Sequence, residues 1–366
     1  RNGRGFIGGE IDGRGSLAQQ AGIGNTMILK KYAYPLLIFY FLLIGCTPSI
    51  EKIEGVSTLD LETDWSISKI SASPDGAYLS FNVVGNEDQG IYILEIENEN
   101  YYPVQKDNDR IWYEAHGATW SPDSTTLVAF YPSSVVGTIG QPSIRKTPFD
   151  IVTIDAKSGD IIYGFWDGSY ATWSSNQDEI IILDDDIGKL DQLVPIYQYY
   201  TSTGSYKQVG EGYSNFIAVY DGLEVSSTGL LAYFDKKNLI ITDLESGEQT
   251  GEIKLPSASG PYTLYSPAWS PNGEIIAYIR SKIEDGQMWG SIYFSTREGS
   301  CQGDPLKLET FIRSIDWLPD GQTLVFTTNE PGKIYFLDLN RGVGKELLES
   351  FQNECAYAAK STINGE

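Results

Sequence analysis

A repeated turn signature is the feature that most constrains the fold of this chain. The signature is Ser-Pro-Asp-Gly or a close variant, with an apolar residue (often Trp) before it and alternating apolar residues after it. Six segments align in register, with turn-entry residues Ser73, Ser121, Ser174, Ser226, Ser270 and Leu318. Their spacings are 48, 53, 52, 44 and 48 residues. Self-similarity at such a period predicts a repeat architecture and not a set of unrelated domains.

Every repeat predicts the same local structure. Pro fixes φ at the first central position of the turn, Asp bonds to its own backbone, and Gly takes the left-handed position. A second strand follows with alternating apolar residues such as Leu324 and Phe326, then a third such as residues 334–337, then a weaker fourth. Four strands in roughly 45–50 residues form a propeller blade. We therefore expect an all-β fold, a six-bladed β-propeller of four-stranded antiparallel blades over residues 65–350.

Composition and charge exclude several classes of function for this chain. Apolar residues make up 41% of the 366 residues and charged residues 20%, as in globular proteins. The formal net charge of −23 would repel a phosphate backbone, which argues against nucleic-acid binding. A single histidine, His116, excludes a multi-His metal centre and makes a Ser-His-Asp hydrolase a poor candidate. No G-x-S-x-G motif is present either, so we expect neither catalytic residues nor a cofactor.

The repeat resembles a known family. The pattern Trp-Ser-Pro-Asp-Gly, followed by Ala-Phe, Ile-Tyr, Asp and Gly, is similar to the TolB-like (WD40-like) β-propeller repeat. The match is good in the second, fifth and sixth repeats, fair in the first, and degenerate in the third and fourth. This resemblance implies the propeller fold.

A second signal lies near the amino terminus. Met27 is followed by Lys30 and Lys31 and then by a 13-residue apolar run, residues 32–44. That run is too short to span about 30 Å of hydrocarbon as a helix and fits the apolar region of a secretory signal. It ends at Gly45-Cys46, which resembles the bacterial lipoprotein lipobox. The resemblance implies that Cys46 is lipidated and becomes the first mature residue. The alternative is a buried apolar helix with an ordinary core cysteine.

These signals divide the chain. We expect upstream read-through in residues 1–26, a lipoprotein signal peptide in 27–45, a tether in 46–64, the propeller in 65–350 and a tail in 351–366. Residues 47–60 could instead supply an outer strand that closes the ring. Cleavage before Cys46 would leave a net charge of −26. The predicted location is the bacterial cell envelope, outside the cytoplasm.

Two cysteines remain after cleavage, Cys301 and Cys355. Outside the cytoplasm such a pair can oxidise, and a disulfide would attach the C-terminal tail to the propeller. Two unpaired thiols are the alternative, because spacing alone does not bring two Cα atoms within about 7 Å.

Aromatic residues gather in the segments between blades, at the rim opposite the Ser-Pro-Asp-Gly turns. Exposed Tyr and Trp side chains dominate interaction hot spots and sugar-stacking surfaces, so this rim is a candidate binding face. Packing between blades is the alternative for each residue taken singly. The candidates are Trp112, Tyr113, His116, Trp166, Tyr170, Tyr213, Tyr220, Tyr262 and Tyr265.

The axial channel is a second candidate site. Two residues before each turn entry, the innermost strands carry small or polar side chains, and we expect these to face the channel. The candidates are Thr119, Thr172, Glu224 and Asp316. Paired carboxylates can do acid–base work or hold a cation, whereas a hydrated channel lining is the alternative. Asp184, Asp185, Asp186, Gly188 and Asp191 resemble a calcium loop without its final Glu, and a solvated acidic turn is the alternative.

The sequence therefore predicts a lipid-anchored envelope propeller that binds a protein or peptide as a scaffold. A carbohydrate-binding or carbohydrate-active propeller, using the rim aromatics with Glu224 and Asp316, is the second hypothesis. A structural envelope protein without a discrete site is the third.

Overall fold

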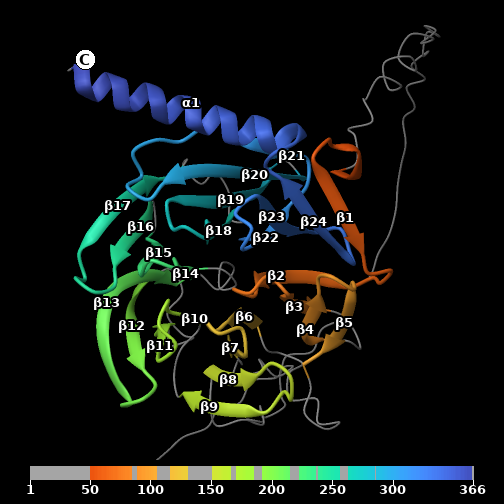
Figure 1. Cartoon of the computed structure of the whole chain (residues 1–366), viewed down its shortest axis with the longest axis vertical. Helices are drawn as coiled ribbons and strands as arrows, with labels where there is room; N and C mark the ends of the chain where they lie inside the picture. Colours follow the sequence, from red (N-terminus) through yellow and green to blue (C-terminus); the bar gives the residue numbers. More distant parts are fainter. Residues whose placement is uncertain are drawn as a thin grey trace, which may run out of the picture. The chain divides into compact units, whose positions relative to one another are not determined.

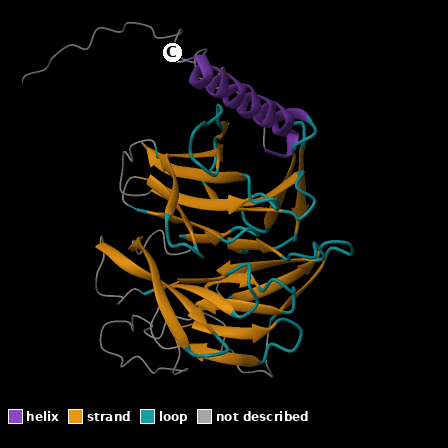
Figure 2. Ribbon diagram, turned by 60° about the vertical axis from the view of Figure 1, so that its left-hand side comes forward, coloured by secondary structure: helices purple, strands orange, loops and turns teal. Residues whose placement is uncertain are grey.

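The computed structural model describes residues 50–84, 89–104, 116–130, 151–165, 170–184, 192–214, 222–235, 238–255, 263–284 and 286–364. These belong to a unit that spans residues 47–366. Within them, 24 strands form six four-stranded antiparallel sheets, which are the blades of a β-propeller. Figures 1 and 2 show the sheets grouped around a common centre.

In every blade the strands follow one another from the innermost to the outermost. The first three blades are β2 (Ser66–Ala72), β3 (Tyr78–Val84), β4 (Gly90–Glu95) and β5 (Asn100–Pro103); β6 (His116–Trp120), β7 (Thr126–Phe130), β8 (Ile151–Asp155) and β9 (Ile161–Phe165); and β10 (Tyr170–Trp173), β11 (Glu179–Leu183), β12 (Gln192–Tyr200) and β13 (Ser205–Ser214). The next two are β14 (Leu223–Val225), β15 (Leu230–Phe234), β16 (Asn238–Asp243) and β17 (Gln249–Lys254); and β18 (Thr263–Trp269), β19 (Ile275–Glu284), β20 (Gln287–Thr296) and β21 (Leu306–Leu308). The sixth is β22 (Ile312–Trp317), β23 (Thr323–Thr328), β24 (Lys333–Asp338) and β1 (Val56–Asp60).

The innermost strands close a ring. β2 contacts β6, and the contacts continue through β10, β14, β18 and β22 back to β2. Buried apolar side chains fill the spaces between successive blades, for example Val128 and Phe130 of the second blade with Trp173 and Ile180 of the third. Each blade therefore buries both faces against its neighbours, as the repeat predicts. The predicted fold class is confirmed.

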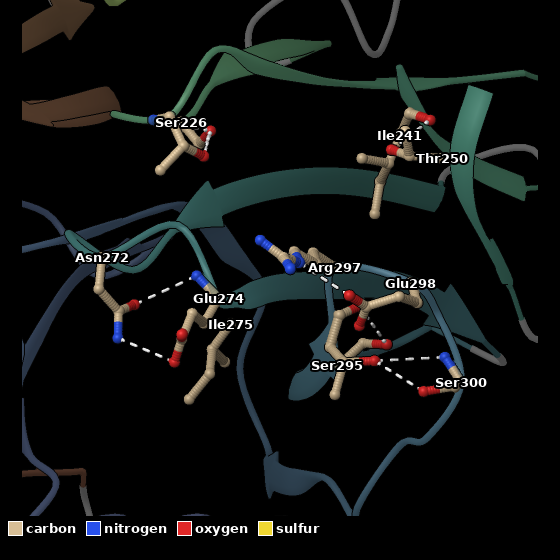
Figure 3. A network of polar contacts seen from close by, with 12 residues as sticks. Ser226, Ile241, Thr250, Asn272, Glu274, Ile275, Ser295, Arg297, Glu298 and Ser300 are labelled. Carbon is tan, nitrogen blue, oxygen red and sulfur yellow. Dashed lines mark hydrogen bonds and ion pairs between the residues drawn. The ribbon is translucent and has the colours of Figure 1, made fainter. Parts of the chain in front are cut away.

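The Ser-Pro-Asp-Gly turns owe their shape to side-chain hydrogen bonds. In the first blade, the Ser73 hydroxyl donates to Asp75 Oδ1 at 2.6 Å and accepts from Tyr78 N at 2.9 Å, and Asp75 Oδ1 also accepts from Ala77 N at 3.0 Å. Gly76 sits at φ 75°, a conformation that glycine adopts without steric cost. In the fifth blade, the Ser270 hydroxyl likewise donates to Asn272 Oδ1 at 2.7 Å and accepts from Ile275 N at 2.9 Å. Asn272 Oδ1 also accepts from Glu274 N at 3.2 Å (Figure 3). The repeated sequence thus encodes a tight link between the first two strands.

The sixth blade combines strands from near both ends of the described chain. Its outermost strand is β1, which pairs antiparallel with β24 from Val56 opposite Leu337 to Asp60 opposite Lys333. Residues 56–60 are therefore part of the propeller, not of a tether over residues 46–64. Strand β1 completes the sixth blade. Without it, β24 would present an unpaired edge, which sheet proteins avoid.

A long helix follows the last strand. α1 (Gly342–Asn364) contacts β1, β20, β21 and β24 (Figure 1). It begins inside the range expected for the propeller, so the predicted boundary at residue 350 falls within a helix. Leu347 and Phe351 are buried against the fifth and sixth blades, and the Phe351 ring lies 5.8 Å from the Phe294 ring. No helix among the described residues is long and apolar enough to cross a membrane.

A disulfide joins α1 to the fifth blade. Cys355 on the helix is bonded to Cys301, which lies between β20 and β21, with the Cα atoms 5.4 Å apart. Gly303 lets the two segments approach closely, since a Cβ there would lie 2.6 Å from the Phe351 Cα.

Candidate functional site

The candidate site is a cavity at the end of the ring where the Ser-Pro-Asp-Gly turns lie, called the turn-end cavity below. Its volume is about 340 Å³, and the C-terminal ends of innermost strands from all six blades line it. Strand β18 contributes through Trp269 and β22 through Asp316 and Trp317. The cavity therefore belongs to the closed ring, because no single blade could form it.

Small turn residues surround the mouth of the cavity. They occupy the position after the turn entry in each repeat: Pro74, Pro122, Ser175, Ser227, Pro271 and Pro319. The Ser227 hydroxyl donates to Pro271 O at 2.6 Å, so the turns of the fourth and fifth blades are joined there. Four proline rings give the entrance a rigid and mostly apolar edge.

Tryptophan side chains form the walls. Trp120, Trp173, Trp269 and Trp317 line the cavity and are 5–8% exposed. Trp120 Nε1 donates to Ser71 O of the preceding blade at 3.1 Å, and Trp269 Nε1 donates to Glu224 O at 3.3 Å. These tryptophans pack between blades and also face the cavity.

Asp316 joins the sixth blade to the first. Its Oδ2 accepts from Ala72 N at 2.7 Å and its Oδ1 from Trp317 N at 2.7 Å. One step further from the mouth, Ser314 Oγ accepts from Ile70 N at 3.1 Å. Backbone N–H groups on the inner edges of β2 and β22 are thus satisfied by side chains of the sixth blade. These bonds strengthen the contact at which the first and last repeats meet.

The other channel candidates lie around the same cavity. Thr119, Thr172 and Glu224 line it together with Asp316, so the structure brings all four residues together. Thr119 is 4% exposed, and its hydroxyl has no hydrogen-bond partner among the described residues. Within the described part of the chain, the lining contains the carboxylates of Glu224 and Asp316 and no Lys, Arg or His. The cavity therefore combines aromatic walls with a negative formal charge.

Lys69 occupies the ring interior beyond the cavity. Its Nζ lies 5.8 Å from the centre of the Tyr170 ring, which joins the first blade to the third by a cation–π contact. The intervening second blade has Gly117, which carries no side chain, at the corresponding position four residues before its turn entry. This contact was not predicted, because nothing in a repeat alignment shows which side chains meet across the axis.

Of the predicted rim residues, the structure describes the side chain of one, Tyr170. Tyr170 is 1% exposed, so it is a core residue and not part of an exposed binding face. His116, Tyr213 and Tyr265 lie in strands, but their side chains fall outside the described part of the chain. Trp112, Tyr113, Trp166, Tyr220 and Tyr262 lie outside the described residues altogether.

Cation ligands are scarce in the described part of the chain. It contains no group of three or more His, Cys, Asp or Glu residues that could hold a metal ion. Asp184 lies just after β11, whereas Asp185, Asp186, Gly188 and Asp191 of the calcium-like segment are not described. Calcium binding there stays a prediction.

Comparisons with known proteins concern the fold. No family profile matches the sequence, and no curated protein is significantly similar to it. A solved TolB structure from Agrobacterium tumefaciens is 15% identical, with 78% of this chain and 98% of that one covered and a TM-score of 0.48. The β-propeller domain of Cps50 (Swd1) from Myceliophteria thermophila is 11% identical, with coverages of 77% and 98% and a TM-score of 0.46.

Proposed function

We propose that this chain is a binding scaffold of the bacterial cell envelope, anchored through a lipid on Cys46, and that it takes a segment of a partner protein at the turn-end cavity. The observation that carries the proposal is the cavity itself, with its apolar mouth, tryptophan walls and a few polar groups. Ligand sites are typically concave and mostly apolar with a few convergent polar groups. Aromatic side chains also dominate protein-binding hot spots.

Site-specific photo-crosslinking in cells tests the binding site. We would place a benzophenone amino acid at Ser175, on the mouth of the cavity, and as a control at Glu245, outside the cavity lining. We expect a discrete protein adduct from position 175 and none from position 245. Adding Ser227→Trp, which fills the mouth, should abolish the adduct. Adducts that persist in the Ser227→Trp chain would contradict the proposal.

Mass spectrometry and fractionation test the anchor separately. The intact mass of the mature protein should correspond to residues 46–366 with acyl chains on Cys46. Burial of each acyl CH₂ contributes about 0.8 kcal/mol, so this protein should sediment with membranes. Cys46→Ala should release it. An unmodified Cys46 in a membrane-free protein would remove this part of the proposal.

Carbohydrate binding remains the second candidate, supported by the tryptophan walls and the two carboxylates of the cavity. Trp rings stack on sugars, and carboxylates accept hydrogen bonds from sugar hydroxyls. A glycan array probed with the wild-type chain and with Ser227→Trp separates the two candidates. A glycan signal that disappears on filling the mouth would favour carbohydrate, and an empty array would eliminate it.

A further inference from the structure

We infer that Tyr163 and Tyr199 form a site of oxidative modification, at which a peroxidase joins the second and third blades through a dityrosine bond. This inference is independent of the proposed function. It follows from three properties of the pair: the short distance between the two hydroxyl groups, the exposure of Tyr163, and the position of the two residues on different blades.

The two phenols meet at the boundary between neighbouring blades. Tyr163 lies on β9, the outermost strand of the second blade, and Tyr199 lies on β12 of the third (Figure 1). Their hydroxyl oxygens are 3.1 Å apart, which is within hydrogen-bond distance. Their ring centres are 6.4 Å apart, with an angle of 46° between the ring planes. The carbons that couple in dityrosine are the Cε atoms beside each hydroxyl, so this contact brings the reacting edges of the two rings together.

Strand pairing holds both tyrosines in position. Tyr199 lies opposite Ile180 of β11 and Tyr206 of β13, and it packs against the apolar cluster between the second and third blades. Tyr163 lies opposite Thr153 of β8. Two reactants held in contact react in an effectively unimolecular step, which is far faster than the same step between separate molecules. Coupling within the pair should therefore exceed coupling to a tyrosine of another molecule.

Solvent reaches the pair through Tyr163, which is 42% exposed, whereas Tyr199 is partly buried. An oxidant can take an electron from Tyr163 at the surface, and the contact between the hydroxyls connects Tyr199 to it. Burial, together with the hydrogen bond to Tyr163, raises the pKa of Tyr199 to about 12. Tyr199 is therefore protonated at neutral pH and loses its proton together with its electron.

The reaction balances with hydrogen peroxide as the final oxidant and a haem peroxidase as the one-electron carrier. Each phenol loses one electron and one proton and becomes a phenoxyl radical. The two radicals form a Cε–Cε bond, and the hydrogen on each of these carbons moves to the phenolic oxygen as the rings regain aromaticity. Hydrogen peroxide accepts the two electrons and the two protons and becomes two molecules of water. The crosslinked chain is therefore two hydrogen atoms lighter.

Two other close tyrosine pairs in the described part of the chain lack one of these properties. Tyr278 and Tyr293 stack with ring centres 5.0 Å apart, but Tyr278 is fully buried. Tyr197 and Tyr206 are in edge-to-face contact at 5.2 Å, and their strands, β12 and β13, are already paired within one blade. The proposed crosslink instead joins two blades.

Peroxidase treatment of the full mature chain tests the site. A haem peroxidase and hydrogen peroxide are added to a dilute mixture of unlabelled and isotope-labelled protein, and tryptic peptides are analysed by tandem mass spectrometry. Trypsin places Tyr163 in the peptide 158–189 and Tyr199 in the peptide 190–207. We expect these two peptides to be linked through Tyr163 and Tyr199, with pairs of one label at least about tenfold more abundant than pairs of mixed label. The absence of this pair, or linkage mainly through other tyrosines or between labels, would overturn the inference.

Two substitutions locate the crosslink. Tyr163→Phe removes one of the two hydroxyls and should abolish the linked pair. The matched control is Tyr206→Phe on β13, where the side chain is 68% exposed, and it should leave the yield unchanged. Thermal unfolding checks that each variant is folded. An undiminished yield of linked peptides 158–189 and 190–207 in the folded Tyr163→Phe chain would overturn the inference.

The crosslink should also stabilise the ring, because a covalent bond between the two blades restricts the unfolded chain. We expect the melting temperature of the crosslinked wild type to rise by at least about 3 °C over the untreated protein. Tyr163→Phe treated in the same way should show no rise. Equal melting temperatures of crosslinked and untreated wild type would overturn this stabilising effect.

Discussion

Single residues in the repeated turns show how a sequence motif becomes a stabilising structure. Asp123 Oδ1 accepts hydrogen bonds from Ser121 Oγ at 2.6 Å, from Thr125 Oγ1 at 2.8 Å and from Thr125 N at 3.1 Å. Burial alone would raise the pKa of Asp123, but the hydrogen bonds from Ser121 and Thr125 outweigh it and lower the pKa to about 2. The adjacent Ser124 adopts φ 61° where four of the other five repeats have Gly, a conformation that non-Gly residues rarely adopt. The aspartate therefore helps to hold a turn that lacks the preferred glycine.

Replacement of Asp123 by Ala should lower the free energy of unfolding by about 1 kcal/mol at pH 7, because exposed hydrogen bonds contribute modestly. The pKa is lowered in the folded state, so the stabilisation is complete above the unfolded value of 3.8 and is lost as the pH falls towards 2. Urea unfolding of wild type and Asp123→Ala at pH 7, 4 and 3 should show the difference shrinking with acid. The exposed Asp304→Ala is the control, expected within about 0.5 kcal/mol of wild type. A difference independent of pH would refute this account.

At the scale of elements, α1 depends on the propeller for its position. Val343 N donates to Glu54 O at 3.0 Å where the helix begins, Leu347 and Phe351 are buried in its middle, and Cys355 is bonded to Cys301. The disulfide closes a loop of 54 residues and so fixes the helix to the β20–β21 connection. Loss of this disulfide would free the helix in the folded state. It would also give the unfolded chain more conformations, which lowers the free energy of unfolding.

Cys355→Ser should destabilise the propeller by about 2–4 kcal/mol, the usual range for a native disulfide. Backbone amides of residues 342–356 should exchange faster with deuterium, measured by mass spectrometry, while those of β2 and β3 change little. Wild type treated with dithiothreitol should reproduce the variant, and the variant should not respond to the reductant. Unchanged exchange in α1 would show that packing alone holds the helix.

At the largest scale, the described strands form a ring that is closed by segments near the two ends of the described chain. The outermost strand of the sixth blade comes from residues 56–60, and its other three come from residues 312–338. The segment before β1 contributes as well: Ile50 is buried in the core of the fifth and sixth blades, and Glu51 and Glu330 pair with Lys333. The Glu51 hydrogen bond is the main cause of the raised pKa of Lys333. Ring closure therefore depends on residues more than 270 positions apart in sequence.

A chain that starts at residue 61 should leave β24 as an unpaired edge. We expect its melting temperature to fall by at least about 5 °C relative to a chain that starts at residue 47, together with a tendency to associate. Calorimetry and size-exclusion chromatography measure the two effects. A synthetic peptide of residues 50–60 added in trans should restore part of the loss, and a scrambled peptide should not. Equal melting temperatures would show that β1 does not contribute to closure.

The repeat, the number of blades and the structure of the turns follow from the amino-acid sequence. Those features depend on local chemistry, namely Pro, Asp and Gly at fixed offsets and alternating apolar residues, and such chemistry can be read one segment at a time. The four channel positions Thr119, Thr172, Glu224 and Asp316 followed from the same alignment, because equivalent residues of equivalent strands lie at the same level of a ring.

Which residues meet between repeats depends on the three-dimensional arrangement of the blades. The pairing of β1 with β24, the Lys69–Tyr170 contact, the bonds of Asp316 to the first blade and the packing of α1 all join segments that are distant in sequence. Tyr170 shows the limit most clearly, since its place between blades looks like an exposed rim position and proves to be core. An alignment shows what each blade repeats, whereas contacts across the axis and at the closure depend on how unlike residues of different blades face one another.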